Sequence, residues 1–173
     1  MSDREGGSGT ALVRHARAED LGRVAELVAE HAAYEKAAPP APDLAARLAG
    51  LLFGVEGPGP VPAPDRTRPR LRCLVAELPD GSLAGYATCA PELSTWDGAE
   101  YLHMDCLYLT ATARGHGLGP LLIAAVREEA RVLGLTEIQW QTPVWNEGAI
   151  RFYDRLGATS KEKRRYSLPS QPA

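Results

Sequence analysis

The chain has 173 residues, of which 45% are hydrophobic and 24% charged, and its formal net charge at pH 7 is −3. This length and composition are typical of one globular domain that needs neither a disulfide nor a metal to hold its core. The acidic balance argues against a general nucleic-acid binder, which carries a basic surface, and no apolar run approaches the ~20 residues of a membrane helix.

The first ten residues are polar and glycine-rich, and they lack the apolar stretch of a secretory signal. They predict a disordered tail before a single domain at 11–173. Three cysteines, at positions 73, 89 and 106, lie in strand-like apolar runs without metal-ligand spacing. We expect free, buried thiols, no bound metal and a cytoplasmic location.

The first elements come in the order strand, helix, helix. Residues 12–15 predict a short strand, and residues 18–31 predict an amphipathic helix because apolar residues recur at three- and four-residue steps. A second helix is predicted over 43–53, with Asp43 as its N-cap. Residues 54–70 contain five prolines and three glycines, so they predict a long surface loop.

The second half predicts mainly strands. The turn Pro79-Asp80-Gly81 joins two strand patterns into a hairpin. The predicted strands are 71–78, 82–90, 100–109, 137–142 and 161–168, and the predicted helices are 118–133 and 146–156. The fold class is therefore a mixed α/β sandwich, with helices on both faces of one sheet.

The turn at residues 114–120, Arg-Gly-His-Gly-Leu-Gly-Pro, carries the strongest functional signal. Alternating glycines allow positive φ angles and close approach of a ligand, and the first N–H groups of a helix attract an anion. A P-loop would need Gly-Lys-Ser/Thr after its glycines, and a dinucleotide fingerprint would need a glycine where Pro120 stands. The turn predicts a diphosphate site.

Arg-x-x-Gly-x-Gly after a strand resembles the acetyl-CoA signature of the GNAT acetyltransferases. Within that superfamily the chain is similar to the diamine (spermidine/spermine) and thialysine N-acetyltransferases. The resemblance implies a central, mostly antiparallel, splayed sheet. It covers about residues 12–168, and the matching segments are Tyr34-Glu35-Lys36, Tyr101-Leu102, Trp145-Asn146-Glu147, Ile150, Phe152-Tyr153, Arg155 and Gly157-Ala158.

The resemblance implies that Tyr153 donates a proton to the departing thiolate. Asp105 is the candidate that receives the amine proton, through water, and that binds the cation. The diamine enzymes carry two adjacent acids here, whereas this chain has Asp105 followed by Cys106. His103 is an alternative base, since we expect it on the same strand face as Asp105. We expect Cys106, as a covalent acetyl carrier, to be disfavoured because it would point to the opposite face.

The remaining site residues also follow from the resemblance. The CoA contacts would be Leu107, Tyr108, Leu109, Arg114, Gly115, His116, Gly117, Leu118, Gly119, Pro120, Asn146, Glu147, Gly148 and Ala149. The amine contacts would be Tyr34, Glu35, Trp96, Asp97, Asp105, Gln139, Trp140 and Gln141. Glu35 and Asp97 suit a distal ammonium and Trp96 suits a cation–π contact, although each is equally typical of an ordinary surface or core residue.

The expected activity is transfer of an acetyl group from acetyl-CoA to a primary amine of a polyamine, diamine or lysine-like amino acid. The resemblance also implies a homodimer. Two alternatives stay open: acetylation of a protein or peptide, and a CoA-binding regulatory protein without turnover.

Overall fold

The structure is a computed structural model that describes residues 10–54 and 69–170. The chain divides into two compact units, residues 1–141 and residues 142–173. The predicted tail at 1–10 and the predicted loop at 54–70 lie almost entirely outside the described residues.

The first unit contains most of the predicted elements within a few residues of their expected bounds. Its elements are β1 (Leu12–His15), a 3-10 turn (Ala18–Asp20), α1 (Leu21–Tyr34), α2 (Leu44–Phe53), β2 (Arg72–Glu77), β3 (Leu83–Ser94), β4 (Ala99–Leu109), a 3-10 turn (Ala111–Ala113), α3 (Leu118–Leu133) and β5 (Ile138–Gln139). The last of these strands is shorter than predicted. Asp43 precedes α2 as expected, but its carboxylate pairs with Arg47 at 2.9 Å and makes no cap bond.

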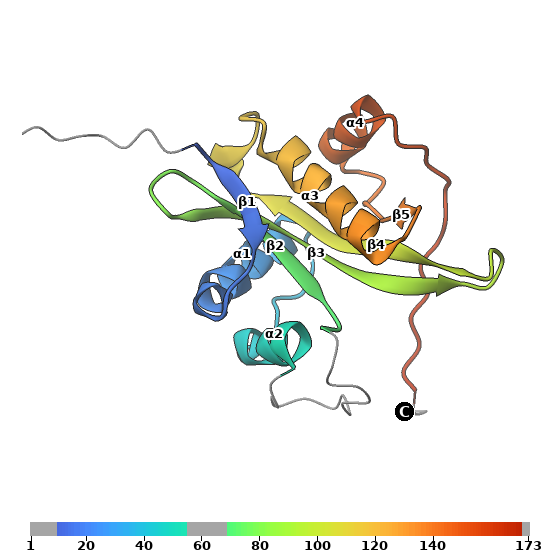
Figure 1. Ribbon diagram of the computed structural model, residues 1–173, viewed down its shortest axis with the longest axis horizontal. Coiled ribbons are helices and arrows are strands. Elements are labelled where there is room, and N and C mark those ends of the chain that lie inside the picture. Colours follow the sequence, from blue (N-terminus) through green and yellow to red (C-terminus); the bar gives the residue numbers. More distant parts are fainter. Residues whose placement is uncertain (1–9, 55–68, 171–173) are drawn as a thin grey trace, which may run out of the picture. The chain divides into compact units, whose positions relative to one another are not determined.

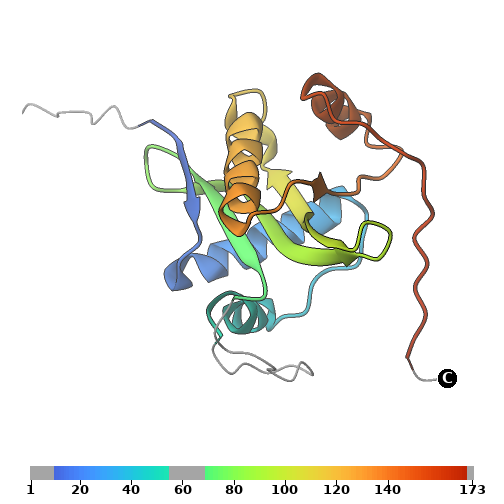
Figure 2. The ribbon, with the colours of Figure 1, turned by 45° about the vertical axis from the view of Figure 1, so that its right-hand side comes forward.

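The five strands form one sheet in the order β1-β2-β3-β4-β5. Neighbouring strands are antiparallel except for β4 and β5, which are parallel. Helices α1 and α2 cover one face of this sheet, and α3 covers the other (Figures 1 and 2). The mixed α/β class, with a mostly antiparallel sheet, is confirmed.

The core beneath α1 holds the functional part of the sheet in place. Val24 and Leu27 of α1 are fully buried, and they pack in one cluster with Val75, Tyr86 and Tyr108 of the sheet. Burying an aliphatic side chain of this size stabilises the fold by about 1.5–3 kcal/mol. Helix α1 is thereby fixed against β3 and β4.

A β-bulge lies in the middle of β4. Thr88 of β3 pairs with Cys106 and Cys89 pairs with Met104, so Asp105 is an extra residue without a partner on β3. Because side chains alternate along a strand, one extra residue resets the alternation. By register, His103 and Cys106 lie on the same face of the sheet, the one that α1 covers.

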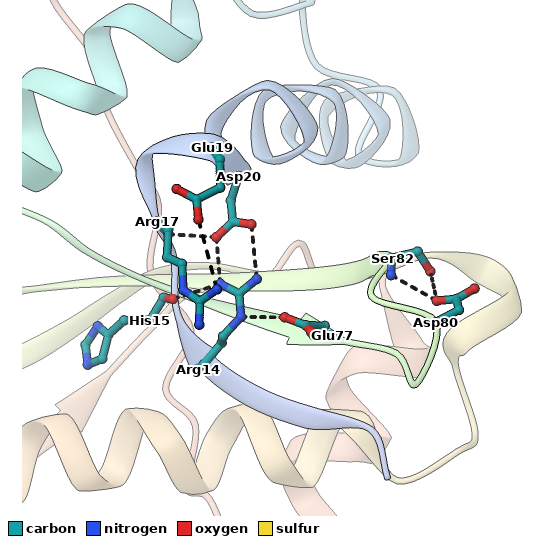
Figure 3. A network of polar contacts seen from close by, with 8 residues as sticks. All are labelled: Arg14, His15, Arg17, Glu19, Asp20, Glu77, Asp80 and Ser82. Atoms are coloured by element: carbon teal, nitrogen blue, oxygen red, sulfur yellow. Dashed lines mark hydrogen bonds and ion pairs between the residues drawn. The ribbon is translucent and has the colours of Figure 1, made fainter. Parts of the chain in front are cut away.

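A network of charges holds the start of α1 to the sheet (Figure 3). Arg14 of β1 donates to both oxygens of Asp20, at 2.6 and 3.1 Å, and to Glu77 of β2. The backbone N–H of Arg17 donates to the same Asp20 carboxylate at 2.7 Å. These bonds hold the pKa of Asp20 below its ordinary value, chiefly because of Arg14.

The second unit contains α4 (Glu147–Arg155). Asn146 caps this helix by accepting a bond from the N–H of Ala149 at 3.2 Å. The predicted strand at 161–168 is wrong, since the segment has no regular structure and all its residues are exposed. Its basic residues lie at both odd and even positions, so neither face would be apolar enough to be buried.

In the described part of the chain, no helix combines the length and apolar character needed to span a membrane.

Candidate functional site

The glycine turn has the conformation that its sequence predicts. Gly115 and Gly117 have φ angles of 81° and 82°, and a β-carbon on either would meet no atom within 4 Å. Gly117 immediately precedes α3, which begins at Leu118. The first N–H groups of a helix have no partner inside it, so the backbone here is open to an anionic ligand.

Arg114 connects this turn to the end of α1. Its guanidinium lies 4.5 Å from the ring centre of Tyr34 and 5.6 Å from that of Tyr108, and its Nε donates to the carbonyl of Leu109 at 3.0 Å. Stacking on aromatic rings orients the guanidinium and leaves its outer N–H groups available to a phosphate. The diphosphate role of Arg114 stays a prediction.

Aromatic and acidic side chains gather where α1 crosses β4. His31 stacks on Tyr108 with ring centres 5.0 Å apart and planes 21° apart. The Tyr108 hydroxyl donates to Glu30 at 3.5 Å, and Glu35 Oε1 lies 3.4 Å from His31 Nε2. Such a cluster suits a cationic ligand, because the carboxylates attract it and the rings offer it π faces.

Asp105 lies at the bulge with 59% of its side chain exposed, so a ligand can reach it. His103 Nε2 lies 4.0 Å away, and only 18% of that side chain is exposed.

The strand face that we expected for Cys106 is wrong, because the bulge brings its sulfur to 3.6 Å from Asp105 Oδ2. Burial, together with the Asp105 charge, raises the pKa of the Cys106 thiol to about 11. The thiol is therefore protonated at neutral pH and is a poor nucleophile.

The edge of β4 that faces β5 is mostly unpaired in the described part of the chain. Strand β5 pairs with β4 only at Leu102 and His103, and Leu107–Leu109 lie beyond those pairs. The contacts with CoA that the resemblance implies for Leu107, Tyr108 and Leu109 stay a prediction. Gln139 pairs with His103, and Trp140 and Gln141 follow it in the chain.

Trp96 and Asp97 lie at the tip of the β3–β4 hairpin. Trp96 is 96% exposed, and the Asp97 carboxylate accepts a hydrogen bond from the Ser94 hydroxyl. Strand β4 runs from the tip at Ala99 to Asp105, a distance of about 20 Å at the usual rise per residue. The structure therefore does not gather these two residues at Asp105.

The predicted residues of the second unit lie on one helix. Asn146, Glu147, Gly148 and Ala149 form its cap and first turn. The N–H of Ala149 is bonded to the Asn146 side chain and that of Glu147 to the carbonyl of Trp145, and the CoA contacts expected of these residues stay a prediction. Tyr153 lies one turn further on, half-buried, with its ring centre 5.3 Å from that of Phe152.

Sequence reasoning missed three residues of the first unit's site: Glu30, His31 and Tyr86. A signal for His31 was present, because it lies four residues after Leu27 on the apolar stripe of α1, where a polar side chain is unusual. Tyr86 is 1% exposed, and its hydroxyl lies 3.0 Å from His31 Nδ1. The sequence carries no comparable signal for Tyr86, which is identified as a site residue only by this tertiary contact.

Residues 45–158 match the acetyltransferase (GNAT) family. The chain belongs to this family. It is therefore an acyltransferase, and the family uses acetyl-CoA as its cosubstrate.

The chain is 29% identical, over 156 residues, to a thialysine N-epsilon-acetyltransferase from Sus scrofa, covering 86% of this chain and 84% of that protein. It is 29% identical over 99 residues to an L-ornithine N5-acetyltransferase from Arabidopsis thaliana, covering 57% of this chain and 42% of that protein. A solved structure of a possible acetyltransferase from Clostridium difficile 630 superposes with a TM-score of 0.71 at 14% identity. That superposition covers 95% of this chain and the whole of the other, and it shows the fold.

Proposed function

We propose that the protein transfers an acetyl group from acetyl-CoA to a primary amine of a small cationic acceptor, a polyamine, diamine or lysine-like amino acid. One observation carries the proposal. Arg114, the first residue of the glycine turn, lies over the ring of Tyr34, so a diphosphate site adjoins the acidic and aromatic cluster. The relatives that act on thialysine and ornithine support the choice of a short amino acid with a second amine.

The residues of the first unit would have separate roles in CoA binding, ammonium binding and proton transfer. The N–H groups after Gly117 and the guanidinium of Arg114 would hold the diphosphate of CoA. The Asp105 carboxylate is exposed, so it would bind the ammonium and take its proton. Glu35 and Glu30 would hold a second ammonium. The thiol of Cys106 stays protonated, which favours direct transfer over a covalent acetyl-enzyme.

The test is a thiol-release assay with acetyl-CoA over a panel of spermidine, putrescine, thialysine, ornithine, lysine, aminoglycosides and short peptides. We expect turnover with at least one lysine-like amino acid or diamine. Turnover with peptides alone would support the protein-acetylating alternative. Tight CoA binding without turnover on any amine would support the regulatory alternative.

Tyr153→Phe tests the role of this tyrosine as the proton donor to the thiolate. We expect turnover to fall by about 10²-fold, the usual contribution of a general acid, while calorimetry finds acetyl-CoA affinity within about threefold of wild type. Tyr166→Phe, a change of an 84%-exposed tyrosine in the same unit, is the control. Equal turnover of Tyr153→Phe and wild type would remove Tyr153 from the reaction.

A homodimer is part of the same proposal, and analytical ultracentrifugation tests it.

A further inference from the structure

His31 lies between the core and a carboxylate of the proposed amine site. Its Nδ1 lies 3.0 Å from the hydroxyl of Tyr86, and its Nε2 lies 3.4 Å from Glu35 Oε1. Tyr86 is 1% exposed, whereas 14% of the His31 side chain and 33% of the Glu35 side chain are exposed. The imidazole therefore joins a fixed group of the core to a carboxylate that a ligand can reach.

The hydroxyl of Tyr86 can hold the imidazole in either protonation state. Burial raises the pKa of this hydroxyl, so it keeps its hydrogen at neutral pH. A hydroxyl both donates and accepts, so it can donate to Nδ1 of a neutral ring and accept from Nδ1 of an imidazolium. His31 also stacks on Tyr108 with ring centres 5.0 Å apart. Protonation of His31 thus changes the charge beside Glu35 without requiring the ring to move.

Two charged residues contact the tyrosine ring that stacks on His31. Glu30 accepts a bond from the Tyr108 hydroxyl at 3.5 Å, and the guanidinium of Arg114 lies 5.6 Å from the ring centre. Glu30 also pairs with Arg23 at 2.8 Å. A guanidinium keeps its charge throughout the neutral range, so the pairing of Glu30 does not depend on pH.

Glu35 differs from Glu30 because an imidazole lies beside it. Imidazole is the side chain that ordinarily changes charge between about pH 5 and 8. An imidazolium pairs with the carboxylate and competes with an ammonium for it, whereas a neutral imidazole leaves the negative charge to the ligand. We propose that His31 determines acceptor specificity by setting the charge that Glu35 offers to the second ammonium of the acceptor. The inference rests on the proposed function.

The specificity of the enzyme should therefore change with pH. When His31 is neutral, Glu35 binds the second ammonium, and acceptors with two amines are preferred. When His31 is protonated, it occupies the carboxylate and this preference falls. Acceptors with a single amine gain nothing from Glu35, so their rates lack this component.

The first test compares acceptors that differ only in the second amine: putrescine with butylamine, and thialysine with its analogue without the α-amine. The ratio of kcat/KM within a pair removes effects on CoA and on the reacting amine, including those of His103 beside Asp105 and of His116 in the glycine turn. In wild type we expect this ratio to be about threefold lower at about pH 6 than at about pH 8, an effect within the range of a partly exposed ion pair.

Three variants separate His31 from other causes. His31→Gln stays polar and does not change charge, so its ratio should not vary with pH. Glu35→Gln should lower the ratio about threefold at about pH 8 and make it independent of pH. His15→Gln, which changes a 62%-exposed histidine of β1, should keep the pH dependence of wild type.

A packing defect would lower the rates of both members of a pair and leave their ratio unchanged. A wild-type ratio that is equal at the two pH values, or that varies equally in His31→Gln, would overturn the proposal.

A second measurement needs no turnover. Because linkage is reciprocal, an amine that binds best beside a neutral His31 must lower the pH at which His31 is half protonated. NMR titration of the imidazole, assigned with His31→Gln, is made with CoA and saturating putrescine or butylamine. We expect the midpoint to be about 0.5 pH unit lower with putrescine, the equivalent of a threefold change in affinity.

The two measurements also distinguish this inference from the proposed function. Equal midpoints with putrescine and butylamine would exclude the coupling of His31 to the second ammonium, even where both amines are acetylated. A lower midpoint with putrescine but no turnover on any amine would support the coupling and refute only the proposed function.

Discussion

At the scale of single residues, the bulge at Asp105 changes the sheet face to which the side chains of β4 point. Strict alternation predicts that both point to one face and that Cys106 points to the other. The register instead places His103 and Cys106 on one face, and Asp105 is the unpaired residue within 4.0 Å of both side chains. Asp105 is also the more exposed of the two candidate bases.

This geometry predicts which base matters. We expect Asp105→Asn to lower kcat/KM by about 10²-fold, since the amide neither takes a proton nor attracts an ammonium, and His103→Gln to lower it by less than about fivefold. Steady-state kinetics of both variants with thialysine, beside folded-state controls by circular dichroism, make the comparison. The opposite order of effects would assign the base to His103.

At the scale of elements, two features fix the strands that carry the site. Asp20 ties the start of α1 to β1 through Arg14, with only 9% of its side chain exposed. Gly85 allows β3 to approach β4, because a β-carbon there would collide with the carbonyl of Tyr108 and the side chain of Leu109. The free energies of unfolding of an Asp20 variant and a Gly85 variant test these two features.

Asp20→Asn should reduce the free energy of unfolding by about 2–3 kcal/mol at neutral pH, since Arg14 loses one of its two charged acceptors and keeps only Glu77. The folded-state pKa of Asp20 lies below its unfolded value. Its stabilisation is therefore complete above the unfolded pKa of about 3.9 and is lost as the pH falls through the folded value. Urea denaturation at about pH 7 and pH 3 should show a smaller variant deficit at the lower pH, and Glu19→Gln, an exposed neighbour, should show none at either.

Gly85→Ala should destabilise the protein by about 2–3 kcal/mol, because the added methyl group has no space between two paired strands. The matched control is Gly22→Ala in α1, where a β-carbon meets nothing within 4 Å. We expect that control to be neutral or stabilising by up to about 1 kcal/mol. Similar losses in both variants, measured by urea denaturation, would contradict the role of the strand approach.

At the scale of the whole molecule, binding of a ligand to the folded state should increase the free energy of unfolding. A ligand at about 100 times its Kd stabilises the folded state by about 2.7 kcal/mol, which for a chain of this size raises Tm by about 5–10 °C. We expect coenzyme A to produce such a shift in a thermal melt. Gly117→Ala should lose at least half of it, while Gly98→Ala, also at a positive φ but on the hairpin tip, should keep it.

The sequence by itself determined the features that are local. Helix α3 lies at 118–133 as predicted, the hairpin of β2 and β3 follows from Pro79-Asp80-Gly81, and the glycine turn has its positive φ angles. Each depends on periodicity or on backbone freedom over a few residues, which the sequence shows directly.

Only the tertiary structure decided the rest. The bulge at Asp105, the contact of His31 with Tyr86 and the position of Arg114 over Tyr34 depend on which residues meet across strands and helices. A strand pattern does not show where one extra residue enters a ladder, and it does not show whether a segment such as 161–168 has a strand to pair with. Register and partner choice are non-local, and they place the side chains of the site.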